Sequence, residues 1–260
     1  MEKKVETIKL LDGTVWDKAE LIKKMDDDEF YYNVCGKNML SSSIAKTLLH
    51  SYKKFVKELK WGTKETQALR DGWLFHTAIL EPHVFEAQQF IDIKGRTTKA
   101  FKEAEIEYGK CFTVAERKSA ERLADGFLMN SKLVSVLKNA EFEVAIAGNV
   151  MGMPFRGKAD IITETGQIID LKTTINIKNT KWAFKDFSYD LQCFIYCNLF
   201  GISYKDFKFI AIDKGTLVPK WIDVSEEFYL TGEQKCEAAV KEYNDHKDTD
   251  LNEYLLYETI

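Results

Sequence analysis

Residues 155–174 read FRGKADIITETGQIIDLKTT, and this stretch predicts a β-hairpin. Isoleucine-rich arms flank a polar turn at Glu164–Gln167, a pattern typical of two short antiparallel strands. Because side chains alternate between the faces of a strand, Asp170 and Lys172 point to one side and Leu171 points to the other. The tight turn brings the first arm alongside the second. The charged residues that then share one patch are Asp160, Asp170 and Lys172.

Two carboxylates on one patch favour a divalent cation. Crowded carboxylates repel each other and raise each other's pKa, and a shared cation relieves the repulsion. Oxygen ligands favour Mg²⁺ or Mn²⁺ over zinc, and the backbone carbonyl of Leu171 is a natural further ligand. Such a cation activates water and neutralises charge that develops on a phosphodiester. Lys172 would orient or deprotonate the water, or stabilise the transition state. The hairpin therefore predicts a metal-dependent phosphodiesterase.

The composition predicts a globular protein. The chain has 260 residues, of which 45% are hydrophobic and 30% are charged, so it can bury one sizeable core. We expect a single domain over residues 1–260, with residues 1–36 as an N-terminal elaboration. No run approaches the roughly 18 apolar residues of a spanning helix, and the first residues lack the apolar stretch of a secretory signal. Five irregularly spaced cysteines fit reduced thiols. We expect a cytoplasmic protein without membrane contact.

Charge is distributed unevenly along the chain. The net charge of −4 disfavours a protein that coats nucleic acid with its whole surface. Residues 37–70 nevertheless contain eight Lys or Arg against two acids, whereas residues 223–258 contain eleven acids against three bases. A solvated helix face explains an isolated basic segment most simply. The basic segment at residues 37–70, however, leads directly toward His76, a residue that could join the carboxylate patch. This position favours contact with DNA over a merely solvated face.

The order of predicted elements gives an α/β (α+β) fold with a central mixed β-sheet flanked by helices. The hairpin lies within that sheet. We expect helices over about 41–60, 64–81, 99–108, 115–138, 189–200 and 226–245, and strands over 89–93, 141–150, 155–163, 168–174, 207–212 and 217–224.

Three polar positions outside the hairpin have open roles. His76 lies on a mostly apolar helix with Gly72 one turn earlier, and a lone histidine there is more often a core residue than a ligand. Gln192 and Tyr196 are four residues apart and share a helix face; they cap a core edge or serve a site. Glu143, on the strand before the hairpin, joins the site or lies at its rim.

The motifs resemble those of a known superfamily. Asp160 followed by Asp170-Leu171-Lys172 resembles the signature of the PD-(D/E)XK nucleases, although Ala159 replaces the nominal proline. Gly72-x-x-x-His76 and Gln192-x-x-x-Tyr196 resemble the upstream histidine motif and the downstream helix motif of RecB-like nucleases. The segments LSSSIAKTLLHS and LRDGWLFHTAILEPHVF are similar to the RecE (exonuclease VIII) group of phage recombination exonucleases. The resemblance covers roughly residues 40–204.

The resemblance implies roles for these residues. His76, Asp160, Asp170 and the Leu171 carbonyl would bind the metal, Lys172 would be the catalytic lysine, and Gln192 with Tyr196 would position the lysine or the scissile strand. Independently of the resemblance, the free N–H groups at the helix start at Ser41–Ser43 can hold a 5′ phosphate, although capping by the serines themselves is the commoner use. No iron–sulfur cluster is expected, since only Cys236 follows the downstream motif. The expected DNA contacts are Ser41, Ser43, Lys46, Lys53, Arg70 and Arg156.

The implied function is a Mg²⁺- or Mn²⁺-dependent exonuclease similar to RecE and lambda exonuclease. It would degrade the 5′ strand of linear duplex DNA and leave 3′ overhangs for a single-strand annealing protein. It would work as a ring-shaped homo-oligomer, a trimer or tetramer, in a bacterial host or encoded by a phage. One alternative is a nuclease of the same fold that trims CRISPR spacer precursors or cuts branched DNA. The other is an inactive scaffold that binds DNA ends, against which the intact Asp, Asp and Lys argue.

Overall fold

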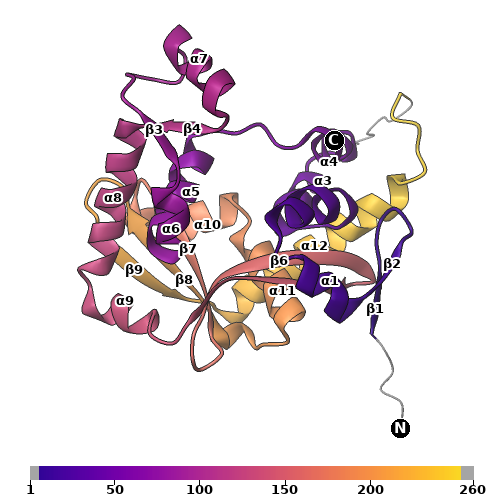
Figure 1. Cartoon of the computed structure of the whole chain (residues 1–260). Helices are drawn as coiled ribbons and strands as arrows, with labels where there is room; N and C mark the ends of the chain where they lie inside the picture. The colour runs from indigo at the N-terminus through magenta and orange to yellow at the C-terminus, as the bar shows by residue number, and fades with distance from the viewer. Residues whose placement is uncertain (1–5, 253–260) are drawn as a thin grey trace, which may run out of the picture.

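A five-stranded mixed sheet forms the centre of the chain in a computed structural model that describes residues 6–252 (Figure 1). Its strand order is β5-β6-β7-β8-β9, and all neighbours are antiparallel except β7 and β8. The predicted fold class, a mixed sheet flanked by helices, is confirmed. The strands are β5 (Glu141–Val150), β6 (Met153–Ile162), β7 (Ile168–Thr174), β8 (Phe207–Asp213) and β9 (Pro219–Asp223).

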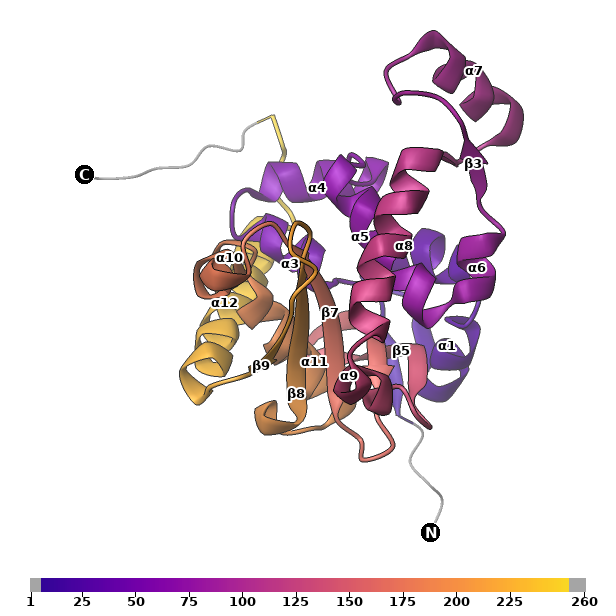
Figure 2. The ribbon, with the colours of Figure 1, turned by 90° about the vertical axis from the view of Figure 1, so that its left-hand side faces the viewer.

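Helices cover both faces of this sheet (Figure 2). Because side chains alternate along β8, Phe209 and Ala211 enter the core on one face while Ile210 and Ile212 enter the core on the other. The first face is covered by α3 (Ser42–Leu48), α4 (Tyr52–Trp61), α10 (Thr180–Asp186), α11 (Tyr189–Phe200) and α12 (Glu226–His246). The second is covered by α5 (Gln67–Leu80), α8 (Val114–Leu128) and α9 (Ser131–Val136).

Smaller elements surround this core. The N-terminal elements pack through their own apolar cluster against Ala145 and Ala147 of β5. The segment from α6 to β4 carries α7, which projects from the body in both views (Figures 1 and 2). Within residues 6–252, no helix has the length and apolar character to cross a membrane. The smaller elements around the core are β1 (Thr7–Lys9), β2 (Val15–Asp17), α1 (Lys18–Lys24), the π-helix η1 (Phe30–Cys35), α2 (Gly36–Asn38), α6 (Pro82–Glu86), β3 (Gln89–Ile91), α7 (Lys99–Tyr108) and β4 (Cys111–Thr113), with the 3₁₀ turns η2 (Ile177–Asn179) and η3 (Tyr204–Asp206).

Two predicted long helices are each divided in two. The helix expected over 41–60 ends at Leu48, and α4 begins after Ser51, whose hydroxyl accepts a hydrogen bond from the Lys54 N–H at 3.3 Å. The helix expected over 115–138 is interrupted at Asn130, whose side chain accepts from the N–H of Leu133 at 3.3 Å. Both residues are good N-caps, so each starts a new helix. The predictions of single helices were wrong because these capping signals were missed.

Candidate active site

The site lies where β6 and β7 separate. The two strands pair only beside their turn, at Ile161 with Ile169 and Ile162 with Ile168. Beyond these pairs, the Asp160 carboxylate takes the place of a strand partner and accepts a hydrogen bond from the Leu171 N–H at 2.7 Å. Divergence of two neighbouring strands leaves an opening in the sheet, and the polar residues of the hairpin surround it.

Other segments satisfy the backbone of β6 that β7 leaves free. Leu40 pairs with this strand, its N–H donating to Pro154 and its carbonyl accepting from the Arg156 N–H at 2.8 Å. The Tyr196 hydroxyl donates to the Lys158 carbonyl at 3.0 Å and accepts from the Lys158 N–H at 3.2 Å. Gly157 leaves room for the Tyr196 ring, because a Cβ there would lie 3.1 Å from it. In the described chain the Tyr196 hydroxyl therefore holds the strand that carries Asp160. Its expected role in positioning the lysine or the scissile strand stays a prediction, and its side chain lines the cleft described below.

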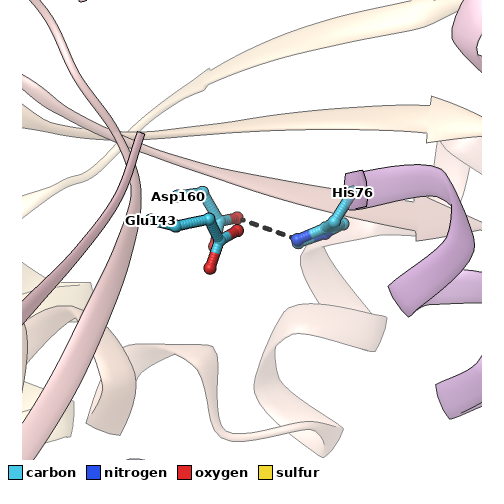
Figure 3. Close-up of side chains that lie close together, drawn as sticks. All are labelled: His76, Glu143 and Asp160. Carbon is cyan, nitrogen blue, oxygen red and sulfur yellow. Dashed lines mark ion pairs between the residues drawn. The ribbon is translucent and has the colours of Figure 1, made fainter. Parts of the chain in front are cut away.

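Three potential metal ligands converge in the opening (Figure 3). His76 from α5, Glu143 from β5 and Asp160 from β6 each offer a ligand atom, and these atoms lie within 4.8 Å of one another. His76 Nε2 donates to the Leu171 carbonyl at 2.9 Å, while Nδ1 faces Asp160 Oδ2 at 3.5 Å. Since a carbonyl only accepts, the proton belongs on Nε2 and the Nδ1 lone pair is free for a cation. One imidazole and two carboxylates suit a divalent cation such as Mn²⁺ or Mg²⁺.

Glu143 joins this cluster through its strand register. The pairs Phe142 with Ile161 and Val144 with Ala159 place Glu143 opposite Asp160. Its φ of 51° lies in the left-handed region, which costs a residue other than glycine about 1 kcal/mol or more. The sequence alone is compatible with a place for Glu143 in the site or at its rim. A two-residue turn at Met151 and Gly152, both with positive φ, sets the register, and recognising that turn would have paired the two carboxylates.

Asp170 and Lys172 lie beside the cluster. The Lys172 ammonium forms an ion pair with Asp170 Oδ1, and the Gln192 amide donates to Asp170 Oδ2. In the described chain, Oδ2 of this buried carboxylate accepts a hydrogen bond, whereas Oδ1 has the Lys172 ion pair but no hydrogen-bond partner. The Leu171 carbonyl accepts from His76. The structure brings all five predicted hairpin and histidine groups together. The metal-ligand roles of Asp170 and Leu171 remain predictions, because a cation would have to displace these contacts.

The acids of the site hold protons unusually tightly. Burial raises the pKa of Asp160 and of Asp170 to about 6. Burial, reinforced by the Asp160 charge, raises the pKa of Glu143 to about 8. Burial, together with the Lys172 charge, lowers the pKa of His76 to about 4, so the imidazole is neutral at pH 7. Burial alone would lower the pKa of Lys172, but the Asp170 carboxylate raises it overall. A neutral imidazole beside acids with raised pKa values is an arrangement that a cation would stabilise.

These shifts predict how the stability of the metal-free protein depends on pH. The pKa of Glu143 is about 8 in the folded chain and 4.5 without perturbation, so the folded state binds this proton more tightly. That stabilisation is complete below pH 4.5 and is lost as pH rises through 8. In EDTA, we expect the melting temperature of the wild type to fall between pH 6 and 8.5 more steeply than that of Glu143→Gln. Thermal melts followed by circular dichroism check this, and equal slopes would contradict it.

A large cleft extends from this site. Its volume is about 1160 Å³, and its walls come from η1, α2, α3, α4, α5, β6 and α11. Ser41, Ser43 and Arg156, three of the expected DNA contacts, line it. Arg156 is only 8% exposed, and its guanidinium lies 4.2 Å from the centre of the Tyr31 ring. Its Nε has no hydrogen-bond partner among residues 6–252. A buried guanidinium with an unsatisfied donor favours an anionic ligand in the cleft.

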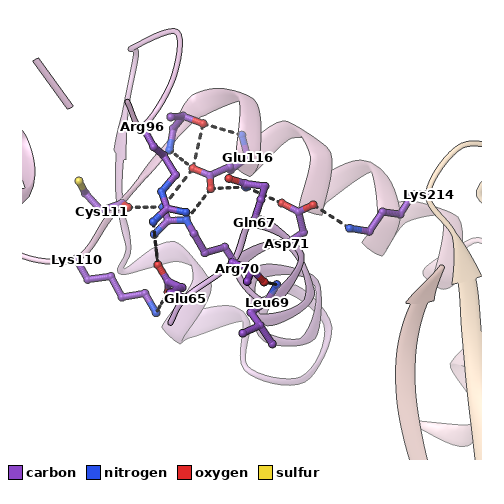
Figure 4. Close-up of polar contacts among 12 residues, drawn as sticks. Glu65, Gln67, Leu69, Arg70, Asp71, Arg96, Lys110, Cys111, Glu116 and Lys214 are labelled. Carbon is purple, nitrogen blue, oxygen red and sulfur yellow. Dashed lines mark hydrogen bonds and ion pairs between the residues drawn. The ribbon is translucent and has the colours of Figure 1, made fainter. Parts of the chain in front are cut away.

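Arg70 is not available for DNA, contrary to the sequence-based expectation (Figure 4). Its side chain is fully buried, its Nε donates to Glu116 at 2.8 Å, and its Nη1 pairs with Glu65 at 3.0 Å. Nη2 donates to the Cys111 carbonyl at 2.6 Å. The positive charge of Arg70 is thus neutralised by two carboxylates. These contacts connect α5 to β4 and α8, and so they fix the position of the helix that carries His76.

Lys46 and Lys53 also lie outside the cleft within the described chain. The Lys46 ammonium is 5.3 Å from the centre of the Phe187 ring, and burial lowers its pKa. Lys53 is exposed on α4. Any DNA contact of these two lysines would therefore involve nucleic acid outside the cleft.

One family model and one solved structure agree with this architecture. A model of the PDDEXK-like domain of unknown function (DUF3799) matches residues 41–252. The crystal structure of a protein from Eubacterium rectale named "Putative exonuclease" aligns with a TM-score of 0.63 and 17% identity, over 90% of this chain and 95% of that one. At this identity the likeness shows a shared fold. The structure of SSO0001 aligns over 79% of this chain and 85% of that one, at 19% identity and a TM-score of only 0.31. No curated protein matches the chain.

Proposed function

The chain belongs to the family of PDDEXK-like domains of unknown function (DUF3799), and from this premise we propose that it is a divalent-metal-dependent nuclease acting on DNA. The observation that carries the proposal is the convergence of His76, Glu143 and Asp160 beside the Asp170–Lys172 pair. Three separate segments of the chain supply these groups. A buried cluster of this kind costs free energy unless a cation or a substrate uses it.

Each residue has a distinct part in the proposed mechanism. His76, Glu143 and Asp160 would hold the cation. Asp170 and the Leu171 carbonyl would be further ligands if the cation displaced their present partners. When bound, the cation supplies an activated water and neutralises charge on the phosphodiester. Gln192 fixes the Asp170 carboxylate, which in turn orients the Lys172 ammonium. Lys172 then directs the attacking water or stabilises the pentacovalent transition state through its positive charge.

We further propose that the substrate is the end of linear duplex DNA, degraded on its 5′ strand to leave a 3′ overhang. This polarity rests on the resemblance to RecE and lambda exonuclease, as do the annealing partner, the ring-shaped oligomer and a cytoplasmic, phage-type setting. The name of the Eubacterium rectale protein supports exonuclease activity. Arg156, Ser41 and Ser43 would contact the strand inside the cleft, since all three line it.

The direct test uses duplex DNA labelled at its 5′ or 3′ ends, with Mg²⁺, Mn²⁺ or EDTA. We expect early release of the 5′ label, no release in EDTA, and no cleavage of covalently closed circles. Equal cleavage of circles would identify an endonuclease of the same fold. Degradation that persists in EDTA would refute the metal-dependent mechanism. Binding of DNA ends without cleavage under any metal would favour the scaffold alternative.

A further inference from the structure

Lys172 has an aromatic neighbour in addition to its carboxylate partner. Its ammonium lies 4.7 Å from the centre of the Tyr189 ring, within the range of a cation–π interaction. Its side chain is 17% exposed, so water reaches only a small part of it. Two contacts, the Asp170 carboxylate and the ring face, therefore restrict where this ammonium can lie.

Other rings fix the orientation of the Tyr189 ring. Phe184 of α10 meets it edge-on at 4.9 Å between centroids, and Phe187 stacks on it at 5.8 Å. Phe209 of β8 lies 5.9 Å away. With neighbours from a helix, a loop and a strand, the ring cannot turn without disturbing the core. Its remaining exposed surface lines the catalytic cleft.

The backbone before Tyr189 is strained and braced. Ser188 has a φ of 54°, a left-handed conformation that persists only where surrounding contacts enforce it. Lys235 of α12 supplies such contacts: its ammonium donates to the Ser188 hydroxyl at 3.3 Å and to both Asp190 oxygens at 2.8 Å. Gly232 allows this approach, because a Cβ there would lie 2.1 Å from the Asp190 carbonyl oxygen.

The first turn of α11 thus carries both groups that bear on the Asp170–Lys172 pair. Gln192 holds the carboxylate, and Tyr189, three residues earlier on the same face, lies against the ammonium. We propose that Tyr189 is a positioning residue for Lys172, and that α12 sets its place through Lys235 and Gly232. The inference rests on the proposed function, in which Lys172 acts on the water or the transition state.

The test compares Tyr189→Phe, which keeps the aromatic face, with Tyr189→Leu, which removes it. We expect the phenylalanine variant to retain the wild-type kcat and the leucine variant to lose about tenfold, with little change in KM. Trp182→Leu is the matched control, because it removes an exposed aromatic side chain of α10 that lies outside the cleft. A leucine variant with wild-type kcat would overturn the proposal. So would a phenylalanine variant as impaired as the leucine variant, since that result would assign the effect to the hydroxyl group.

A second readout does not depend on nuclease activity. The rate of reductive methylation of Lys172, followed by peptide mass spectrometry, reports how firmly its ammonium is held. We expect faster methylation in Tyr189→Leu than in the wild type and Tyr189→Phe, while Lys178, exposed on η2, reacts equally in all three. If the leucine variant does not fold, Tyr189→Met takes its place. Unchanged reactivity of Lys172 would overturn the positioning role whether or not the protein cleaves DNA.

Discussion

Replacing Lys172 with alanine is expected to lower the rate of the proposed metal-dependent DNA cleavage by about 10²- to 10⁴-fold, the usual contribution of a positioned acid–base group. The ammonium forms an ion pair with Asp170, and it lines the same cleft as the candidate metal ligands His76, Glu143 and Asp160. Its loss removes charge stabilisation that only the transition state uses in full. Single-turnover cleavage of end-labelled duplex DNA at saturating Mg²⁺ measures the effect on the chemical step.

Two controls separate chemistry from folding in this experiment. Lys178→Ala makes the same change at an exposed position outside the cleft, and we expect it to retain wild-type activity. Without its ion pair, the buried Asp170 carboxylate would bind a proton more tightly than its present pKa of about 6 implies. Melting curves at pH 7.5 therefore accompany the kinetics. A folded Lys172→Ala protein that cleaves DNA at the wild-type rate would remove Lys172 from the mechanism.

The hairpin was predictable because its signals are local. An alternation of period two and a polar turn fix which side chains share a face within a single short segment. Asp160 and Asp170 accordingly lie on adjacent strands, and Lys172 lies against Asp170. The observed pair of strands β6 and β7 differs from a regular β-hairpin in one respect. The strands separate after two pairs, because Asp160 and Tyr196 satisfy the backbone in place of the neighbouring strand.

The contributions of distant segments had weaker sequence signals. His76 lies on a mostly apolar helix, which by itself favoured a core residue. Only the resemblance to RecB-like nucleases indicated that this histidine is a metal ligand. Arg70 seemed to belong to a basic surface because its partner Glu116 lies 46 residues away in the sequence, and no local pattern connects the two. Charge counting locates basic segments but does not show which cations are already paired within the fold.

Replacing Asp160 with asparagine should abolish metal binding while it preserves the fold. The amide oxygen can still accept the hydrogen bond that Leu171 N–H now donates at 2.7 Å, so the junction of β6 and β7 is retained. The negative charge between His76 and Glu143 is lost. Because even partners outside the ligand set change metal affinity by about 10- to 100-fold, loss of a direct ligand is expected to cost at least about 100-fold. Calorimetric titration with Mn²⁺ at pH 7.5 measures it, and cleavage should disappear in parallel.

The same titration decides between two ligand sets that share Asp160 and His76. If the cation uses the carboxylates that already face each other, Glu143→Gln weakens Mn²⁺ binding strongly and Asp170→Asn weakens it less. If the cation displaces Lys172 and Gln192 to reach Asp170, the order is reversed. Glu164→Gln, an exposed change in the β6–β7 turn, serves as the control. We expect the first order, because the geometry of Glu143 is already set by its register opposite Asp160, whereas Asp170 must first give up two partners. If Glu143→Gln binds Mn²⁺ with wild-type affinity, Glu143 is excluded as a ligand, and Asp170 is then the expected second carboxylate ligand beside Asp160.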